Sequence, residues 1–322
     1  MNWTLLQNSL LVSALATLMS LSIGFLAALW LSALESRWRN RLLFAAVVAL
    51  VLPPFLVTNC WLYLLGFTGV LKRWLPLNIY SLGGTVWLLA LLTWPITLLF
   101  VLGAWQRLEP AQLEGDTELT GSALIRWLLW PLANAALGQA AVITFVLALN
   151  NFAVPALLQT KVYPAEVWVS FNTTFDSIAA LKLSLPLIVA PLVLVLWLRK
   201  REIAWPQTEA WLPASLFRRQ LGARCLWLSG IVTAIVLLLA VGLPLVQLVS
   251  SAKTWTELAS ALAASRSDVL NSFVYAATTA TVCLALALAS WRWPLGWILW
   301  VPFLVPGVLL GITLIVTLNR PM

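Results

Sequence analysis

Long apolar runs without charged residues alternate with short polar segments along the chain. A membrane-spanning helix needs about 20 apolar residues to cross a hydrocarbon core that is about 30 Å thick. Eight runs reach or approach this length, at residues 9–34, 42–66, 84–105, 133–158, 183–198, 226–250, 271–290 and 295–319. The runs are continuously apolar rather than alternating, which disfavours a β-barrel. The pattern therefore predicts an all-α, polytopic membrane helix bundle with about eight transmembrane helices.

The amino-acid composition excludes a soluble globular protein. Of 322 residues, 62% are hydrophobic and 9% are charged, whereas soluble domains average about 45–50% and about 25%. So few charges cannot cover the water-facing surface of a soluble enzyme. The chain has no histidine, and its cysteines lie far apart in the sequence at Cys60, Cys225 and Cys283. We therefore expect no catalytic residue, no metal site and no cofactor on this chain.

The net charge of +8 indicates membrane orientation rather than nucleic-acid binding, because no polar soluble domain presents the basic residues. Twelve Lys and Arg residues fall on one set of loops and seven on the other. The positive-inside rule assigns the richer set to the cytoplasm. Its members are Arg37, Arg39, Arg41, Arg107, Arg126, Arg199, Lys200, Arg201, Arg218, Arg219, Arg224 and Arg292.

Tryptophan and proline positions refine this picture. Ten of the twenty tryptophans lie near the ends of predicted spans, where an indole can keep its N–H in water; they are Trp30, Trp38, Trp74, Trp105, Trp127, Trp130, Trp197, Trp211, Trp227 and Trp291. Prolines such as Pro53, Pro54, Pro95 and Pro155 fall within or at the ends of runs. Each removes a helical hydrogen bond, and broken helices are typical of transporters.

A weak internal repeat suggests a division of the chain. Asn8-Ser9 opens the first run and Asn271-Ser272 opens the seventh, and the following runs carry Leu52-Pro53-Pro54-Phe55 and Val305-Pro306-Gly307-Val308. On this basis the chain holds five helices of one unit and three of the next. We predict a first half over residues 1–199, a cytoplasmic linker over 200–225, and the start of a second half over 226–322.

The cytoplasmic segment between the third and fourth runs has the pattern of a short surface helix. Pro110 suits a first helical turn, and Gly121 can end the helix in a left-handed turn. Acidic residues cluster early, where the helix dipole favours them, at Glu114, Asp116 and Glu118. An amphipathic stretch with Arg126 and Trp127 then returns to the bilayer at Pro131. The segment is either an interfacial linker or a helix that inserts into a groove of a partner protein.

The stretch from Leu113-Glu114 to Gly121, followed by a proline at the return to the membrane, resembles the EAA loop of bacterial ABC importer permeases of the type I fold. Downstream, Leu-Ala-Leu-Asn-Asn-Phe-Ala-Val-Pro-Ala-Leu-Leu at 147–158 resembles the segment that follows this loop in iron(III)- and thiamine-type permeases. Two features depart from the family pattern. Gly115-Asp116-Thr117 replaces the usual Glu-Ala-Ala, and Pro131 lies closer to Gly121 than the pattern expects.

The resemblance implies a membrane-spanning permease subunit of a binding-protein-dependent ABC importer in a bacterial inner membrane, with iron(III) or a related small solute as cargo. The implied partners are cytoplasmic ATPase subunits that bind the ATP, a periplasmic solute-binding protein and membrane lipid. A second permease chain would complete the missing helices; a truncated, non-functional remnant is an alternative. The EAA-like loop at about 109–131 would couple to the ATPase through Glu114, Asp116, Glu118, Gly121 and Arg126.

Two amides are the candidate pathway residues. Asn150 and Asn151 lie within an otherwise apolar run, and polar side chains at such depth usually face the interior of the bundle. They either line a pathway or form a hydrogen bond between helices. No predicted span contains a pair of acidic and basic residues, which disfavours a proton-coupled carrier. A secondary transporter or channel is the alternative function, and the lack of such charge pairs weakens it.

Overall fold

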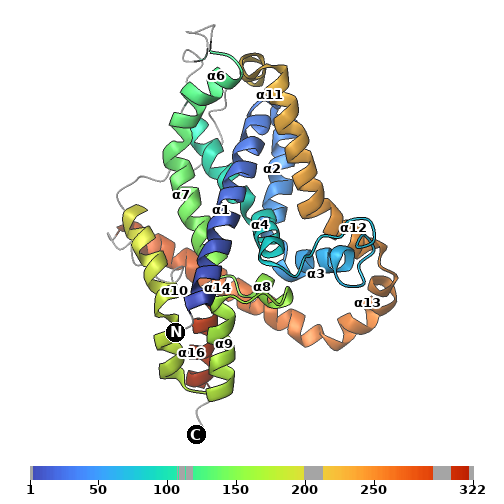
Figure 1. Cartoon of the computed structure of the whole chain (residues 1–322), viewed down its shortest axis with the longest axis vertical. Coiled ribbons are helices and arrows are strands. Elements are labelled where there is room, and N and C mark those ends of the chain that lie inside the picture. Colours follow the sequence, from blue (N-terminus) through green and yellow to red (C-terminus); the bar gives the residue numbers. More distant parts are fainter. Residues whose placement is uncertain are drawn as a thin grey trace. The chain divides into compact units, whose positions relative to one another are not determined.

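The computed structural model describes residues 3–106, 108, 113, 119–198, 213–292 and 306–318. These residues divide into two compact units: the described parts of Met1–Pro244 and Pro306–Met322 form the first, and those of Leu245–Val305 form the second. Every secondary-structure element of the described residues is a helix (Figure 1). The predicted all-α helix bundle is confirmed.

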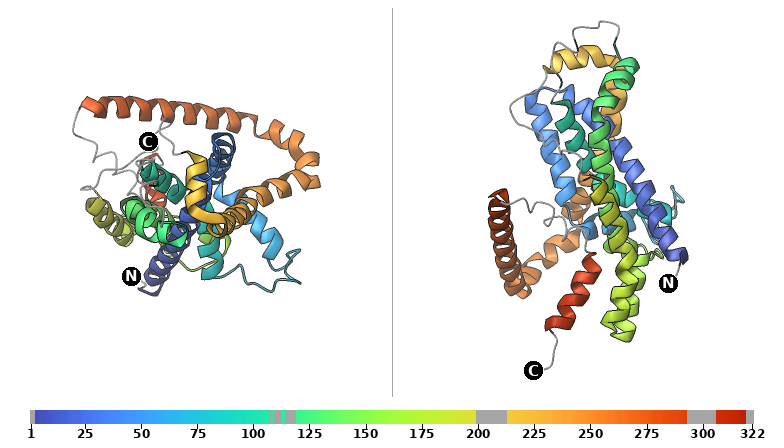
Figure 2. Two further views of the ribbon diagram at one scale, coloured as in Figure 1. Left: turned by 90° about the horizontal axis from the view of Figure 1, so that it is seen from above. Right: turned by 90° about the vertical axis from the view of Figure 1, so that its left-hand side faces the viewer.

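Three long helices form the core of the first unit. The helices α1 (Trp3–Ser32), α4 (Leu82–Trp105) and α7 (Trp130–Leu149) pack on one another (Figure 2). Most of the side chains of α4 are buried, so it is the central helix of the three. The backbone of α1 approaches α4 closely at Gly24. Small residues permit such contact between membrane helices, where van der Waals packing rather than the hydrophobic effect drives association.

The run at 42–66 does not form one straight span. It contains α2 (Ser36–Val51) and α3 (Pro54–Leu65), whose axes differ by 89°. Leu52 and Pro53 between them have extended backbone conformations, with ψ of 132° and 129°. A residue that precedes proline is pushed out of the helical region, and here two prolines follow in succession. The single continuous helix predicted at this position is therefore two helices, which form either one broken span or a re-entrant loop.

The run at 133–158 also differs from the prediction. A continuous helix covers Ser122–Leu149, comprising α6 (Ser122–Leu124), the π-helix η1 (Ile125–Leu129) and α7. It ends at Asn150, and the short α8 (Ala153–Leu157) follows. The π-turn ends at Leu129, two residues before Pro131, and such bulges occur where the regular hydrogen-bond ladder is interrupted. The amphipathic stretch and the membrane run are therefore one helix.

Trp105 was predicted to lie at the membrane interface, but the structure places it inside the protein. Its side chain is 2% exposed, and its Nε1–H donates to the carbonyl of Leu129 at 3.0 Å. A tryptophan at the end of a helix can thus satisfy its N–H within the protein instead of in water.

The remaining helices of the first unit lie around this core. These are α9 (Tyr163–Thr174), α10 (Ser177–Leu198), α11 (Ala214–Leu237), the π-helix η2 (Leu238–Gly242) and α16 (Gly307–Leu318). The helix of the run at 183–198 starts earlier than the run, at Ser177, and Asp176 caps it by accepting from the N–H groups of Ile178 and Ala179. Residues 295–305 and 319 of the last run lie outside the described residues.

The helix α12 (Leu243–Ser250) leads into the second unit, which contains α13 (Ala252–Ala264) and α14 (Arg266–Arg292). Within the predicted linker at 200–225, the described part is helical from Ala214 and is interrupted at Gly222, whose φ and ψ are 73° and 157°. The division into halves stays a prediction.

Among the described residues, five helices are long and apolar enough to cross a membrane, or six if the bent α2–α3 pair counts as one span. Shorter apolar helices occupy Ile178–Leu194 and Gly307–Thr317, at two of the eight predicted runs. The chain is therefore a multi-pass membrane protein.

Candidate functional site

The ends of five elements meet at one end of the first unit, which we call the basic end. Here α1 and α4 finish, and α2, α6 and α11 begin. The Arg218 Nε and Nη2 groups donate to the carbonyl of Ala33, at 3.2 and 3.1 Å. Figure 1 shows α6 beside the start of α11. Contacts between residues far apart in the sequence therefore assemble this end.

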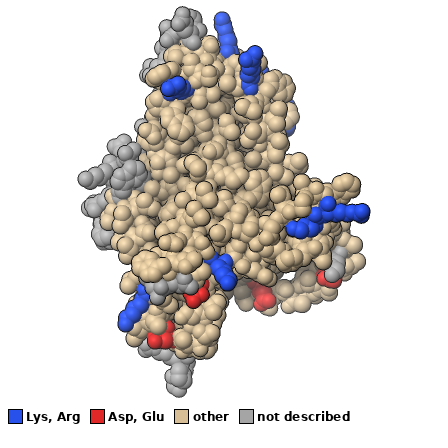
Figure 3. Space-filling model, viewed as in Figure 1, with Lys and Arg blue, Asp and Glu red and all other residues tan. Residues whose placement is uncertain are grey.

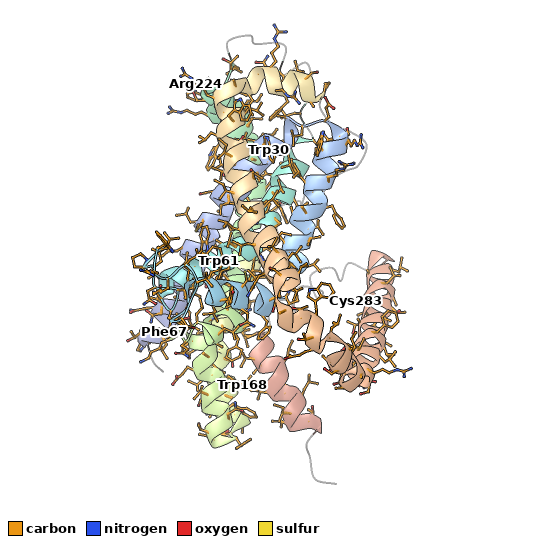
Figure 4. The ribbon with its side chains drawn as sticks, turned by 90° about the vertical axis from the view of Figure 1, so that its right-hand side faces the viewer. Trp30, Trp61, Phe67, Trp168, Arg224 and Cys283 are labelled. Carbon is orange, nitrogen blue, oxygen red and sulfur yellow. The ribbon has the colours of Figure 1, made fainter. Side chains whose placement is uncertain are left out.

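Most of the described arginines of the predicted cytoplasmic set lie on helices that meet here. They are Arg37, Arg39 and Arg41 on α2, Arg126 on η1, and Arg218, Arg219 and Arg224 on α11. Figure 3 shows Lys and Arg side chains at this end, and Figure 4 labels Arg224 there. A cleft of about 440 Å³ lies between the starts of α2 and α11, with Glu35, Arg39 and Arg218 among its lining residues. The concentration of positive charge fits the cytoplasmic side.

The predicted coupling segment returns to the bundle through residues 119–131, which we call the elbow. Gly121 N–H donates to the carbonyl of Gln220 at 2.8 Å, which joins the elbow to α11. Gly121 has φ of 56° and ψ of −121°, a conformation that glycine adopts readily and other residues do not. A Cβ added there would find no atom nearer than 3.7 Å. The backbone angle rather than a lack of space therefore requires glycine.

Gln220 is a site residue that the sequence did not indicate. Its side chain is 8% exposed, and its Nε2 donates to the carbonyl of Leu113 at 2.8 Å. Its backbone and its side chain thus hold two points of the predicted coupling segment. A single glutamine in a polar stretch gives no local signal of such a role, because both partners are distant in the sequence.

The remaining predicted coupling residues fall into two groups. The Arg126 guanidinium lies 5.2 Å from the centre of the Trp127 ring, at cation–π distance, and Trp127 is exposed. Glu114, Asp116 and Glu118 lie outside the described residues. Their role in coupling stays a prediction, as does that of Gly121 and Arg126.

The two predicted pathway amides occupy the break between α7 and α8, and their environments differ. Asn151 Oδ1 accepts from Val154 N–H at 3.0 Å, which is a local bond at the start of α8. Asn150 Oδ1 is buried and has no hydrogen-bond partner among the described residues. A buried acceptor without a partner is costly. Asn150 is therefore the better pathway candidate, and a pathway role for either amide stays a prediction.

Polar contacts tie the start of α1 to the chain beyond α8, near this break. Ser9 Oγ accepts from Tyr163 N–H at 2.7 Å, and Asn8 Nδ2 donates to the carbonyl of Lys161 at 3.3 Å. Burial, with a smaller contribution from the negative charge of Glu166, raises the pKa of the Tyr163 phenol. The phenol is therefore neutral at physiological pH, and this end of the first unit carries no added charge from it.

If the Asn150 amide hydrogen-bonds a passing solute, we expect Asn150→Ala to lower uptake of that solute by on the order of tenfold, the effect of losing one hydrogen bond of about 1.4 kcal/mol. Asn151→Ala is the matched control: it removes the bond to Val154 and should lower the free energy of unfolding by about 0.5–2 kcal/mol while uptake per folded molecule is retained. Uptake in liposomes and unfolding in detergent measure the two effects. Equal uptake by Asn150→Ala and the parent protein would exclude Asn150 from the pathway.

The chain is 28% identical over 178 residues to a probable molybdenum ABC transporter permease protein of Haloferax volcanii. The match covers 53% of this chain and 65% of that protein, so the chain spans just under two thirds of the length of this relative. No family model and no solved structure matches the chain. The likeness supports a relationship with ABC transporter permeases.

Proposed function

We propose that the chain is a membrane-spanning permease subunit of a binding-protein-dependent ABC importer in a bacterial inner membrane. The observation that carries the proposal is the elbow, which packs against α11 at the basic end of a multi-pass bundle through the Gly121–Gln220 hydrogen bond. The likeness to an ABC permease supports the same function. Such a subunit catalyses no reaction itself, because ATP is bound and hydrolysed by separate cytoplasmic ATPase subunits.

The helix that begins within the elbow offers a physical route for coupling. Ser122–Leu149 is one helix of 28 residues, about 42 Å long at about 1.5 Å per residue. Gly121 lies immediately before its first residue and Asn150 immediately after its last. A displacement of the elbow by an ATPase would therefore be carried to the Asn150 end along a helix that is continuous, although π-helical at Ile125–Leu129. The bond from Arg218 to Ala33 passes the same displacement to the end of α1.

The solute is proposed from two separate resemblances. Residues 147–158 favour iron(III) or a related small solute, and the name of the relative adds a molybdenum species. A solute-binding protein delivers the solute, and a second permease chain provides further helices around the pathway. A secondary transporter or channel is less well supported, because it would need neither an elbow nor a likeness to an ABC permease.

The test is reconstitution of the chain in liposomes with the ATPase, the binding protein and any second permease encoded beside it. We expect co-purification with the ATPase, ATP hydrolysis that the binding protein stimulates, and uptake of radioactive iron(III) or molybdate only when ATP is present. Uptake without ATP would favour the secondary transporter or channel. Failure of the chain to associate with the ATPase would favour the non-functional remnant.

A further inference from the structure

A large apolar cavity lies on the first unit, at the end of α2 and α4 opposite the basic end. Its walls come from α3, from the loop at 66–81 that joins α3 to α4, from the first turns of α4, and from Leu239 and Leu243. The cavity has a volume of about 550 Å³, which lies in the range of about 300–1,000 Å³ that ligand pockets occupy. Protein interiors contain few voids larger than a water molecule. The cavity is half-open, so a ligand can enter it from the surface of the unit.

The chemistry of the walls selects an apolar occupant. Leucines from α3 and the loop line most of the surface, together with Trp61 and Trp87. The two indole rings are 5.7 Å apart in an edge-to-face arrangement. Water is a poor occupant of such a cavity, because it needs several polar partners. Trp61 is 8% exposed, and its Nε1–H is itself buried, so the indole presents mainly its apolar surface to the cavity.

The loop over the cavity has the composition of a segment that lies in a lipid interface. Phe67 and Trp74 are 75% and 81% exposed, and the Phe67 ring stacks on Tyr80 with centres 4.3 Å apart. Figure 4 shows Trp61 and Phe67 in the same region of the unit. Exposed aromatic side chains at the ends of spans sit at the level of the lipid headgroups. The mouth of the cavity therefore opens beside lipid rather than toward a soluble partner protein.

Two cations stand at the rim of the cavity. Lys72 and Arg73 lie in the loop between the lining residues Leu71 and Leu75. Lys72 Nζ donates to the carbonyl of Leu77, another lining residue, at 2.8 Å, which holds the ammonium group at the rim. An apolar cavity with positive charge at its edge is complementary to an amphiphile that has an acyl tail and an anionic head.

We propose that this cavity binds one acyl chain of an anionic phospholipid, with the lipid phosphate beside Lys72 and Arg73. The site would be occupied from the bilayer in which the chain sits, and the bound chain would hold the loop at 66–81 against α3 and the start of α4. The proposal does not depend on the transported solute or on an ATPase.

The probe is phosphatidylglycerol with a photoreactive diazirine on its acyl chain, incorporated with the full chain in lipid nanodiscs. We expect labelling, mapped by mass spectrometry, to concentrate in residues 61–87. Gly83 lines the cavity, and a Cβ there would meet only Ser81 Oγ, at 3.7 Å. Gly83→Leu should therefore fill the cavity and remove most of this labelling. Gly311→Leu is the matched control, because Gly311 is also helical, has no atom within 4 Å of an added Cβ, and does not line the cavity.

A second pair of measurements tests recognition of the lipid headgroup with variants that leave Gly83 unchanged. The double variant Lys72→Gln, Arg73→Gln should lower the labelling by phosphatidylglycerol by on the order of tenfold, to the level given by a phosphatidylcholine probe. The phosphatidylcholine labelling itself should not change. Labelling spread evenly over the apolar helices, or equal labelling by both probes in the parent protein, would overturn the proposal. Labelling that Gly83→Leu leaves unchanged in a folded variant would also overturn it.

Discussion

Replacement of Gly121 with proline is expected to abolish ATP-dependent uptake while the chain still inserts in the membrane. Proline fixes φ near about −65°, whereas Gly121 has φ of 56°. Proline also lacks the N–H that donates to Gln220. Both changes separate the elbow from α11. The helix that follows keeps its apolar sequence, so its insertion should not be affected.

Uptake and binding-protein-stimulated ATP hydrolysis in liposomes measure this effect, and the yield of folded chain in membranes controls for insertion. Gln220→Leu should give a partial loss, because it leaves the Leu113 carbonyl without its bond at a cost of about 1–3 kcal/mol. Gly311→Ala should transport normally, because nothing lies within 4 Å of the added Cβ. Normal transport by Gly121→Pro would remove the elbow from the mechanism.

The acidic residues of the predicted coupling helix provide a second arm of the same test. Glu114→Lys combined with Asp116→Lys should abolish association with the ATPase through reversal of charge, without disturbing the Gly121–Gln220 bond. Retention of the ATPase by this double variant would show that the contact is made elsewhere on the basic end.

The helices that the sequence predicted best are those whose apolar runs contain no backbone interruption. The runs at 9–34 and 84–105 correspond closely to α1 and α4, because an uncharged run of sufficient length is helical throughout a membrane. Hydropathy does not show, however, where a helix axis bends within an apolar run. The run at 42–66 is continuously apolar, yet Pro53 and Pro54 turn the chain by 89° within it.

The candidate site was predictable only where its signal is local. The positive-inside pattern indicated one basic end, and the glycine indicated a turn at residue 121, where φ is positive. The contacts that hold the elbow join residues about a hundred positions apart, such as Gln220 with Leu113. Neither a glutamine nor a leucine indicates such a pairing in the sequence. The different environments of Asn150 and Asn151 follow from the residue at which α7 ends, which an uninterrupted apolar run does not specify.

The largest effect on stability is expected from Gly24, where α1 crosses α4. A Cβ at this position would lie 2.4 Å from Thr97 Cβ, 2.7 Å from the Trp94 carbonyl oxygen and 2.9 Å from the Leu98 nitrogen. Two of these atoms belong to the backbone of α4, which cannot rotate away as a side chain can. Since α4 is buried over most of its length, the helix as a whole would have to shift.

We therefore expect Gly24→Ala to lower the free energy of unfolding by about 1–3 kcal/mol, the usual cost of overpacking a core, and Gly24→Leu to prevent stable folding. Unfolding of the purified chain in mixed detergent micelles measures the first effect. The sign of the change in the free energy of unfolding is informative. Alanine is a better helix former than glycine by about 0.5–1 kcal/mol, so without a clash Gly24→Ala would stabilise the chain. Gly311→Ala has open space around it and should be neutral or slightly stabilising. If Gly24→Ala behaved in the same way, α1 and α4 would not be in direct backbone contact.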